Sequence, residues 1–186
     1  MAEEVWLVRH GATEWSKAGR HTSTTDLPLL PEGEDAARGL RSRLDPAAYS
    51  LVLMSPRRRA RETAALAGFA AAEVDDDLAE WAYGDYEGIT SAEIRERDPG
   101  WTIWDGEAPG GETPAEVAAR VDRVIERADA TGGRVLLFAH GHVLRALAAR
   151  WLGESASGGR HYRLDTATVS VLGYEHAERV LLRWNA

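Results

Sequence analysis

Continuous apolar runs along the chain alternate with stretches in which apolar and polar residues are spaced as on the two faces of a helix. Three of these runs have an apolar core without any polar position. Unbroken apolar runs of this length are typical of strands buried on both faces, as in parallel sheets. We therefore expect buried strands over residues 4–9, 50–54 and 135–139.

Helical spacing of apolar and small residues fills most of the chain between these runs. The pattern predicts helices over residues 33–44, 57–67, 114–131 and 143–152. The second of them is expected to open at Ser55-Pro56, with the serine as N-cap and the proline in the first turn. A further short helix opens at Thr90 and stops before Pro99.

The remaining segments complete an α/β pattern. Residues 72–74 are a candidate edge strand, and residues 169–174 and 180–184 predict a terminal hairpin or two late strands. Residues 98–113, rich in Gly, Pro and Trp, predict a loop or lid, and residues 154–159 predict a loop. Strands interleaved with helices imply a mainly parallel sheet covered on both faces. With no repeat or linker, residues 1–186 are expected to form one domain.

The composition narrows the functional class. The 186-residue chain has no cysteine and a formal net charge of −8. These features exclude disulfides and thiolate chemistry, and argue against nucleic acid or an anionic membrane as partner. No apolar run is long enough for a membrane span, and the acidic start lacks the features of a signal peptide, so we expect a cytoplasmic protein. Two-fold dimers are the commonest assemblies, and the sequence leaves a homodimer open.

Two histidines that follow predicted strands are the clearest candidates for chemistry. Arg9-His10-Gly11 ends the first strand, and His140-Gly141-His142 ends the strand over residues 135–139. Because ligands bind at the carboxyl edge of open α/β sheets, both histidines are expected at one site. A neutral imidazole can attack phosphorus and carry the phosphoryl group, and nearby arginines keep it neutral by lowering its pKa.

Two arginines and a glutamate complete this hypothetical site. Arg59, in the first turn of its helix, would join Arg9 in a forked cationic site for a tetrahedral oxyanion. Glu80 lies in an aromatic, glycine-bearing stretch. It is either an ordinary surface acid or a protonated carboxyl group that gives the leaving alkoxide its proton. The hypothesis is phosphomonoester hydrolysis through phosphohistidine, without a metal or other cofactor.

Alternative interpretations of the same residues are less specific. His140 and His142 could be a metal pair, but histidines one residue apart on an extended segment point opposite ways, and no carboxylate cluster completes such a site. Arg57, Arg58 and Arg61 are expected to be solvated rather than a nucleic-acid patch. No chemistry is assignable to the remaining histidines, which are His21, His161 and His176.

Four segments resemble the signature segments of histidine phosphatases of the phosphoglycerate-mutase-like superfamily. They cover residues 7–14, 55–64, 80–88 and 138–142. The resemblance implies a three-layer α/β/α sandwich with a mainly parallel central sheet. It also implies His10 as the phosphorylated nucleophile and Glu80 as the proton donor. The phosphate ligands that it implies are Arg9, Arg59 and His140.

Finer matches at residues 15–22, 75–78 and 141–145 resemble the sedoheptulose-bisphosphatase branch and broad-specificity acid phosphatases of actinobacteria. They imply small sugar phosphates or bisphosphates as substrates. The further substrate-binding residues predicted on this basis are Ser16, Thr22, Ser23, Tyr83, Gly141 and Arg145. Candidate cations for a second phosphate are Lys17, Arg20 and Arg145. Hydrophobic walls formed by Trp81 and Trp104 would instead favour bulky aryl monoesters.

Two other functions stay open at this stage. A cofactor-dependent phosphoglycerate mutase would need basic residues after the donor glutamate, and residues 101–106 contain none. Ser16 also stands where these mutases have asparagine, and Ser23 where many relatives have glycine. A non-catalytic domain could keep the fold to bind a phosphate ligand, but inactive relatives typically lose the nucleophile or the donor. We therefore expect a small-molecule phosphate ester as the partner of an active enzyme.

Overall fold

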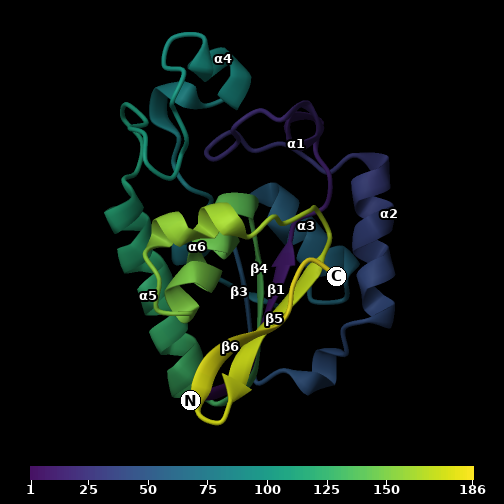
Figure 1. Ribbon diagram of the computed structural model, residues 1–186. Coiled ribbons are helices and arrows are strands. Elements are labelled where there is room, and N and C mark those ends of the chain that lie inside the picture. Colours follow the sequence, from purple (N-terminus) through teal and green to yellow (C-terminus); the bar gives the residue numbers. More distant parts are fainter.

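A six-stranded sheet forms the centre of the computed structural model, which describes residues 1–186 (Figure 1). In spatial order its strands are β3 (Glu73–Val74), β2 (Leu51–Met54), β4 (Gly133–Ala139), β1 (Ala2–Arg9), β5 (Val169–Glu175) and β6 (Glu178–Arg183). The first four strands in this order are parallel. The last two form an antiparallel hairpin on the β1 side. The predicted mainly parallel sheet, its edge strand and the terminal hairpin are confirmed.

Helices cover both faces of the sheet, which confirms the three-layer sandwich. The α-helices of the structure are α1 (Glu14–Ala18), α2 (Pro31–Gly39), α3 (Arg58–Leu66), α4 (Ser91–Arg95), α5 (Pro114–Thr131) and α6 (Gly141–Trp151). Figure 1 shows α5 and α6 on one side of the sheet and α2 and α3 on the other. A separate apolar core fills each side, because residues along β1 and β4 point alternately to the two faces. No helix combines the length and apolar character that crossing a membrane requires.

Several predicted boundaries were wrong. Helix α2 ends at Gly39 and continues only as a 3₁₀ turn over Leu40–Ser42. The stretch predicted as a loop at 154–159 forms a 3₁₀ helix over Ala156–His161. The segment 98–113 is irregular, as expected, but it packs into the fold, since Trp101 and Trp104 are 2% and 6% exposed.

The helix that follows β2 also begins differently from the prediction. Its N-cap residue is Arg57, not Ser55, and α3 starts at Arg58. The Ser55 hydroxyl lies instead against a histidine at the end of the neighbouring strand. Helix α6 starts at Gly141, two residues earlier than predicted, with His140 as N-cap.

The strand register brings the chemically interesting residues to one edge. Arg9 at the end of β1 lies beside Ala139 at the end of β4, and Met54 at the end of β2 lies beside Phe138. The residues that follow these strands therefore meet at the carboxyl edge. In Figure 1 the α1 and α4 segments lie above this edge.

Candidate active site

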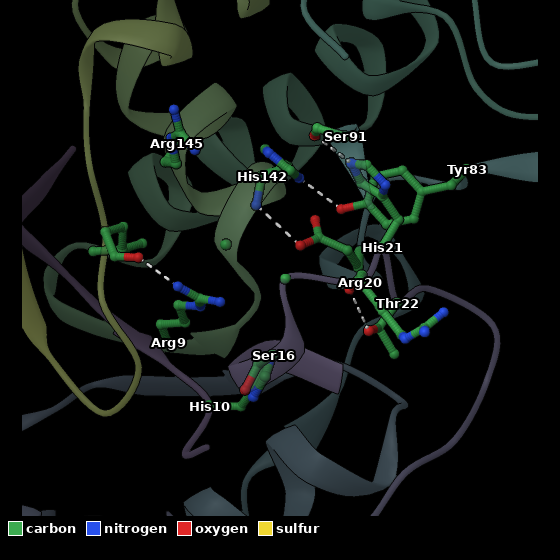
Figure 2. A pocket seen from close by; sticks show the side chains of 14 residues that line it. Arg9, His10, Ser16, Arg20, His21, Thr22, Tyr83, Ser91, His142 and Arg145 are labelled. Atoms are coloured by element: carbon green, nitrogen blue, oxygen red, sulfur yellow. Dashed lines mark hydrogen bonds between the residues drawn. The ribbon is translucent and has the colours of Figure 1, made fainter. Parts of the chain in front are cut away.

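A cavity of about 220 Å³ opens at the carboxyl edge of β1 and β4. Its lining is almost wholly polar, and Figure 2 shows the side chains around a common space. Nine of the residues predicted from the sequence line it: Arg9, His10, Ser16, Arg20, Thr22, Glu80, Tyr83, Gly141 and Arg145. The other lining residues are Gly19, His21, Ser91, His142 and Leu164.

The His10 side chain is held with one nitrogen against its own loop. Its Nδ1 lies 2.7 Å from the carbonyl oxygen of Gly11. A carbonyl only accepts, so Nδ1 carries the hydrogen and Nε2 keeps its lone pair. Burial, and then the charges of Arg9 and Arg59, lower the pKa of His10 well below its ordinary value. The unprotonated Nε2 is therefore available as a nucleophile at neutral pH.

Arg9 and Arg59 are fixed by main-chain carbonyl groups. Arg9 donates through Nη1 to the carbonyl of Leu164. Arg59, which is fully buried, donates to the carbonyls of Thr25 and Thr22 at 3.1 and 2.9 Å. Carbonyl acceptors orient a guanidinium without neutralising its charge, so both arginines keep their full attraction for an anion.

His140 lies directly against His10, beneath the pocket. The two ring centroids are 5.1 Å apart in an edge-on arrangement. Its Nε2 is 2.6 Å from the Ser55 hydroxyl, whereas its Nδ1 is buried without a hydrogen-bond partner. Burial, then the charge of Arg59, lowers the pKa of His140 well below its ordinary value. His140, like Arg59 and Ser23, is buried and does not belong to the pocket lining.

Four buried side-chain nitrogens in the structure have no hydrogen-bond partner. Their residues lie at the end of β1 or follow β2 or β4. The four nitrogens are Arg9 Nε, Arg57 Nε, Arg59 Nε and His140 Nδ1. Buried donors are normally paired, because an unpaired one costs about 1–3 kcal/mol. Three of the four belong to Arg9, Arg59 and His140, which surround His10, and this indicates a site built for an oxygen-rich anion. Arg57, expected to be solvated, is half-buried and belongs to this group, whereas Arg58 and Arg61 are exposed as predicted.

Glu80 is buried, at 6% exposure, and its carboxylate lies at the start of α6. Its two oxygens accept N–H groups from His142 at 2.9 Å, Val143 at 2.8 Å and Trp81 at 2.9 Å. These bonds take the place of those to an N-cap side chain, since the His140 side chain accepts none of the N–H groups of the first turn. The surface-acid alternative is therefore wrong: the glutamate is anchored in the pocket wall.

Tyr83 and two histidines form the wall opposite Arg9 (Figure 2). Burial, and then the charge of Glu80, raises the pKa of Tyr83 well above its ordinary value. Its hydroxyl group, 2.6 Å from His142 Nδ1, is therefore the donor. His21 donates through Nδ1 to the Ile89 carbonyl and lies 3.4 Å from the Ser91 hydroxyl through Nε2. Burial lowers the pKa of both histidines, so this wall is uncharged at neutral pH.

Two of the three predicted rim cations line the pocket. Arg145 is packed over Trp104 at 4.7 Å and donates through Nε to Gly159. Arg20 is exposed and donates to the Gly88 carbonyl. Lys17 is wrong as a rim residue, because it is 61% exposed and pairs with Glu32 at 2.6 Å outside the pocket.

The predicted tryptophan walls are also wrong. Trp81 is fully buried, and Trp104 packs edge-on against it and against His142 from behind. The apolar lining is limited to Tyr83 and Leu164. Tryptophan side chains therefore support the polar wall from the core instead of contacting a ligand.

The small residues predicted to bind substrate take different positions. The Ser16 hydroxyl belongs to the capping box of α1 with Thr13. The Ser23 hydroxyl donates to the Glu80 carbonyl at 3.0 Å, and the Thr22 hydroxyl donates to the Arg20 carbonyl at 3.0 Å. Gly141 gives room to Arg9, whose Cζ would lie 3.3 Å from a Cβ at that position.

His140 and His142 are not joined by a third side chain that could complete a metal site. His140 Nε2 faces Ser55 and His142 Nδ1 faces Tyr83, each engaged with a different partner. No group of three or more His, Cys, Asp or Glu side chains in the structure is placed to hold a metal ion.

Sequence reasoning missed His21, Ser91 and the lining role of His142. The loops that carry His21 and Ser91 meet through a bridge between Arg20 and Thr90 and through hydrogen bonds of the His21 backbone. This contact joins residues about 70 positions apart and leaves no local pattern. For His142, the spacing from His140 suggested a possible pair of metal ligands and did not indicate that His142 lines a pocket.

Comparison with known proteins agrees with this geometry. The sequence matches the histidine phosphatase superfamily (branch 1) over residues 5–186. An acid phosphatase of Mycobacterium tuberculosis is 39% identical, with 94% of this chain and 88% of that protein covered. Sedoheptulose 1,7-bisphosphatase of Saccharomyces cerevisiae is 37% identical over 79% of this chain and 66% of that protein. The solved structure of a Mycobacterium tuberculosis open reading frame product has a TM-score of 0.94 and 37% identity, and covers 100% of this chain and 98% of that one.

Proposed function

The chain belongs to the histidine phosphatase superfamily, and on that premise we propose that it hydrolyses phosphate monoesters of small metabolites through a phosphohistidine on His10. The observation that carries this proposal is the group of unpaired buried nitrogens around His10. A phosphoryl group on His10 would offer oxygens to the donors of Arg9, Arg59 and His140. The names of the two curated relatives, an acid phosphatase and a sedoheptulose bisphosphatase, support the same class of reaction.

The first half-reaction transfers the phosphoryl group to the protein. His10 Nε2 attacks phosphorus, so that an N–P bond forms while the P–O bond to the leaving group breaks. Arg9, Arg59 and His140 hold the non-bridging oxygens and balance their charge. Glu80 gives its proton to the departing alkoxide, which leaves as an alcohol.

The second half-reaction restores the enzyme. Glu80, now ionised, takes a proton from a water molecule, and the resulting hydroxide attacks phosphorus on the side that the alcohol has left. The N–P bond breaks, its electron pair returns to His10 Nε2, and inorganic phosphate leaves. In this scheme the arginines and histidines supply the charge stabilisation that a bound metal provides in other phosphatases.

The lining of the pocket supports a polar, hydroxylated substrate such as a sugar phosphate. Tyr83, His142, His21 and Ser91 present hydroxyl and imidazole groups, and apolar contact is confined to Tyr83 and Leu164. Arg145 lines the pocket, and its Nε and Nη2 donate to main-chain carbonyl groups while Nη1 has no acceptor in the protein. This guanidinium is suited to a second phosphate, so we include sugar bisphosphates among the substrates.

Hydrolysis is favoured over mutase activity by the segment after Glu80. Trp101, Ile103 and Trp104 of this segment are buried in the core and bring no cation to the pocket. A mutase needs additional charge there to hold a bisphosphate that re-phosphorylates the histidine. A purely ligand-binding domain is disfavoured because the nucleophile and the donor are both retained.

A phosphate-release assay tests the proposal directly. The chain, dialysed against a chelator, should release inorganic phosphate from members of a panel of sugar monophosphates, sugar bisphosphates and p-nitrophenyl phosphate. His10→Ala should lose turnover, while the exposed His161→Ala should match the wild type. Radiolabelled substrate should leave an acid-labile label on the wild type and none on His10→Ala. Turnover retained by His10→Ala would refute the covalent route.

The same panel decides the substrate class. A second phosphate held by Arg145 should raise kcat/KM about tenfold to a hundredfold over the matching monophosphate. Arg145→Ala should remove this advantage and leave the monophosphate rates close to wild type. Equal kcat/KM for the two substrate types in the wild type would leave a broad-specificity phosphatase.

A further inference from the structure

We propose that Ser55 is a positioning residue that fixes the tautomer of His140, so that His140 presents an N–H group to the substrate's phosphate. The proposal deepens the proposed function and rests on it. It concerns a hydroxyl that the sequence pattern assigned to helix capping and that the structure turns toward the phosphate site.

The strand register places the two side chains together. Met54 at the end of β2 lies beside Phe138, and the Ser55 N–H donates to the Phe138 carbonyl at 2.9 Å, which extends the ladder by one residue. Ser55 therefore comes level with the end of β4, where His140 follows. Both residues are fully buried, and Ser55 Oγ lies 2.6 Å from His140 Nε2.

The hydrogen atoms in this pair can be assigned by counting donors and acceptors. The backbone N–H of Arg57 donates to Ser55 Oγ at 3.3 Å, so the hydroxyl group already accepts one hydrogen bond. The hydroxyl hydrogen itself has one acceptor within reach, His140 Nε2. If Nε2 carried a hydrogen instead, Ser55 would accept twice and its own hydrogen would be buried without a partner, which is costly. The geometry therefore favours donation from Ser55 to Nε2.

This assignment determines what the other nitrogen of His140 offers. Burial lowers the pKa of His140, so the neutral ring carries a single hydrogen. With Nε2 accepting from Ser55, that hydrogen is on Nδ1, the buried nitrogen that has no partner in the protein. An N–H there attracts a phosphate oxygen, whereas a lone pair would repel it. The two neighbouring histidines thus present opposite functions, a lone pair on His10 Nε2 and a donor on His140 Nδ1.

A histidine side-chain ¹H–¹⁵N spectrum of the wild-type protein gives the first test and needs no Ser55 variant. With His140 assigned by comparison with His140→Gln, Nδ1 should be the protonated nitrogen and Nε2 the unprotonated one. A wild-type His140 protonated on Nε2 would overturn the proposal. Ser55→Ala should shift the ring toward the Nε2–H tautomer, and Ser55→Thr, which keeps a hydroxyl, should restore the wild-type spectrum.

Inorganic phosphate is the probe for the second test. Ser55→Ala should raise its inhibition constant, and the KM for a phosphate ester, about tenfold to a hundredfold, the range expected for one hydrogen bond to a charged group. The kcat should change less than KM, because the bond is made in the ground state and in the transition state alike. Ser170→Ala is the matched control, since Ser170 is equally buried but its hydroxyl accepts from Asn185.

The outcomes separate this inference from the proposed function. If Ser55→Ala leaves the phosphate inhibition constant within about twofold of that of Ser170→Ala, Ser55 does not position His140. If the wild type releases phosphate from no ester, the proposed function fails. The tautomer of His140 and its dependence on Ser55 are still measured in that case, because they are read in the free protein and in its phosphate complex.

Discussion

The Glu80 side chain combines two roles that its geometry puts in tension. Its oxygens accept three backbone N–H groups, two of them from the first turn of α6. The proposed reaction asks the same carboxyl group to deliver a proton. Two of these N–H groups donate to one oxygen, so a lone pair remains on Oε2 of a side chain that lines the pocket. A proton can therefore be carried toward the leaving group without breaking the bonds that hold α6.

Substitution of Glu80 by glutamine should separate the chemical role from the structural one. The amide oxygen can still accept from Trp81 and Val143, which share one carboxylate oxygen, and only the His142 N–H loses its acceptor. The side chain has no acidic proton to give. We expect kcat for an alkyl phosphate to fall about 10²- to 10⁴-fold. The loss with p-nitrophenyl phosphate should be about tenfold or less, because p-nitrophenolate leaves without protonation. Phosphate release from both substrates is the measurement, and an equal loss with both would mean that Glu80 acts only by holding α6.

Residues that act at strand ends could be predicted, whereas those that meet through loops could not. Arg9 and His10 follow directly from an apolar run that ends in polar residues, and the structure places both in the lining of the pocket at the carboxyl edge. His21 has no such signal, because its place depends on backbone hydrogen bonds to Gly88 and Ile89. A pattern of single residues cannot encode a pairing between two loops.

At the scale of elements, helix starts were the least predictable feature. The N-terminus of α6 is satisfied by Glu80, which lies about 60 residues away in the sequence. The serine expected to cap α3 points to His140 instead. In both cases the side chain that matters bonds to a residue distant in the sequence, whereas capping rules describe only bonds between neighbouring residues. The strands were predictable because their burial on both faces leaves continuous apolar runs.

A close approach between the His10 loop and helix α2 is a second feature of this scale. A Cβ on Gly33 would lie 2.3 Å from the Ala12 carbonyl oxygen, and one on Gly11 would lie 2.5 Å from the Gly33 carbonyl oxygen. Backbone therefore touches backbone, and the absence of side chains at both positions allows it. The contact supports the loop that carries the nucleophile from the side opposite the pocket.

Gly33→Ala should therefore damage both stability and activity. We expect a loss of about 1–3 kcal/mol in the free energy of unfolding, typical of overpacking, and a lower kcat/KM because the His10 loop is displaced. Gly39→Ala in the same helix is the control, since nothing lies within 4 Å of its Cβ position. That change should leave kcat/KM unaltered and stabilise by up to about 1 kcal/mol. Denaturant unfolding and phosphate release distinguish the two variants, and similar behaviour of both would contradict the proposed contact.

At the scale of the whole molecule, the tryptophans show what composition alone conceals. Trp81, Trp101 and Trp104 belong to the larger of the two apolar cores, and Trp101 and Trp104 pack against the pocket residues His21 and His142. The sequence placed them near the site but could not say which side of the wall they face. Because these tryptophans are buried, the pocket is lined by polar side chains, chiefly neutral histidines and charged arginines, which the apolar core supports.

Four histidines buried in the neutral form couple this site to the stability of the whole fold. Burial is the first cause of the lowered pKa of His10, His21, His140 and His142. Below about pH 6.5 the unfolded chain takes up protons on these residues, whereas the folded chain does not. The unfolded state then binds more protons, so the free energy of unfolding must decrease as the pH falls through this range.

The size of the decrease follows from the number of groups. Each histidine should cost on the order of 1 kcal/mol per pH unit between about pH 6.5 and its folded-state pKa. Urea unfolding of the wild type at pH 7, 6 and 5 should show this loss before the carboxylates, with ordinary pKa values of about 4, begin to titrate. His142→Asn, which removes one titrating group, should lower the slope by about a quarter. A free energy of unfolding that stays constant from pH 7 to 5 would show that these histidines take up protons alike in the folded and the unfolded chain, and would remove the electrostatic basis for a neutral His10 nucleophile. The same slope in both proteins would show that His142 does not contribute to the loss.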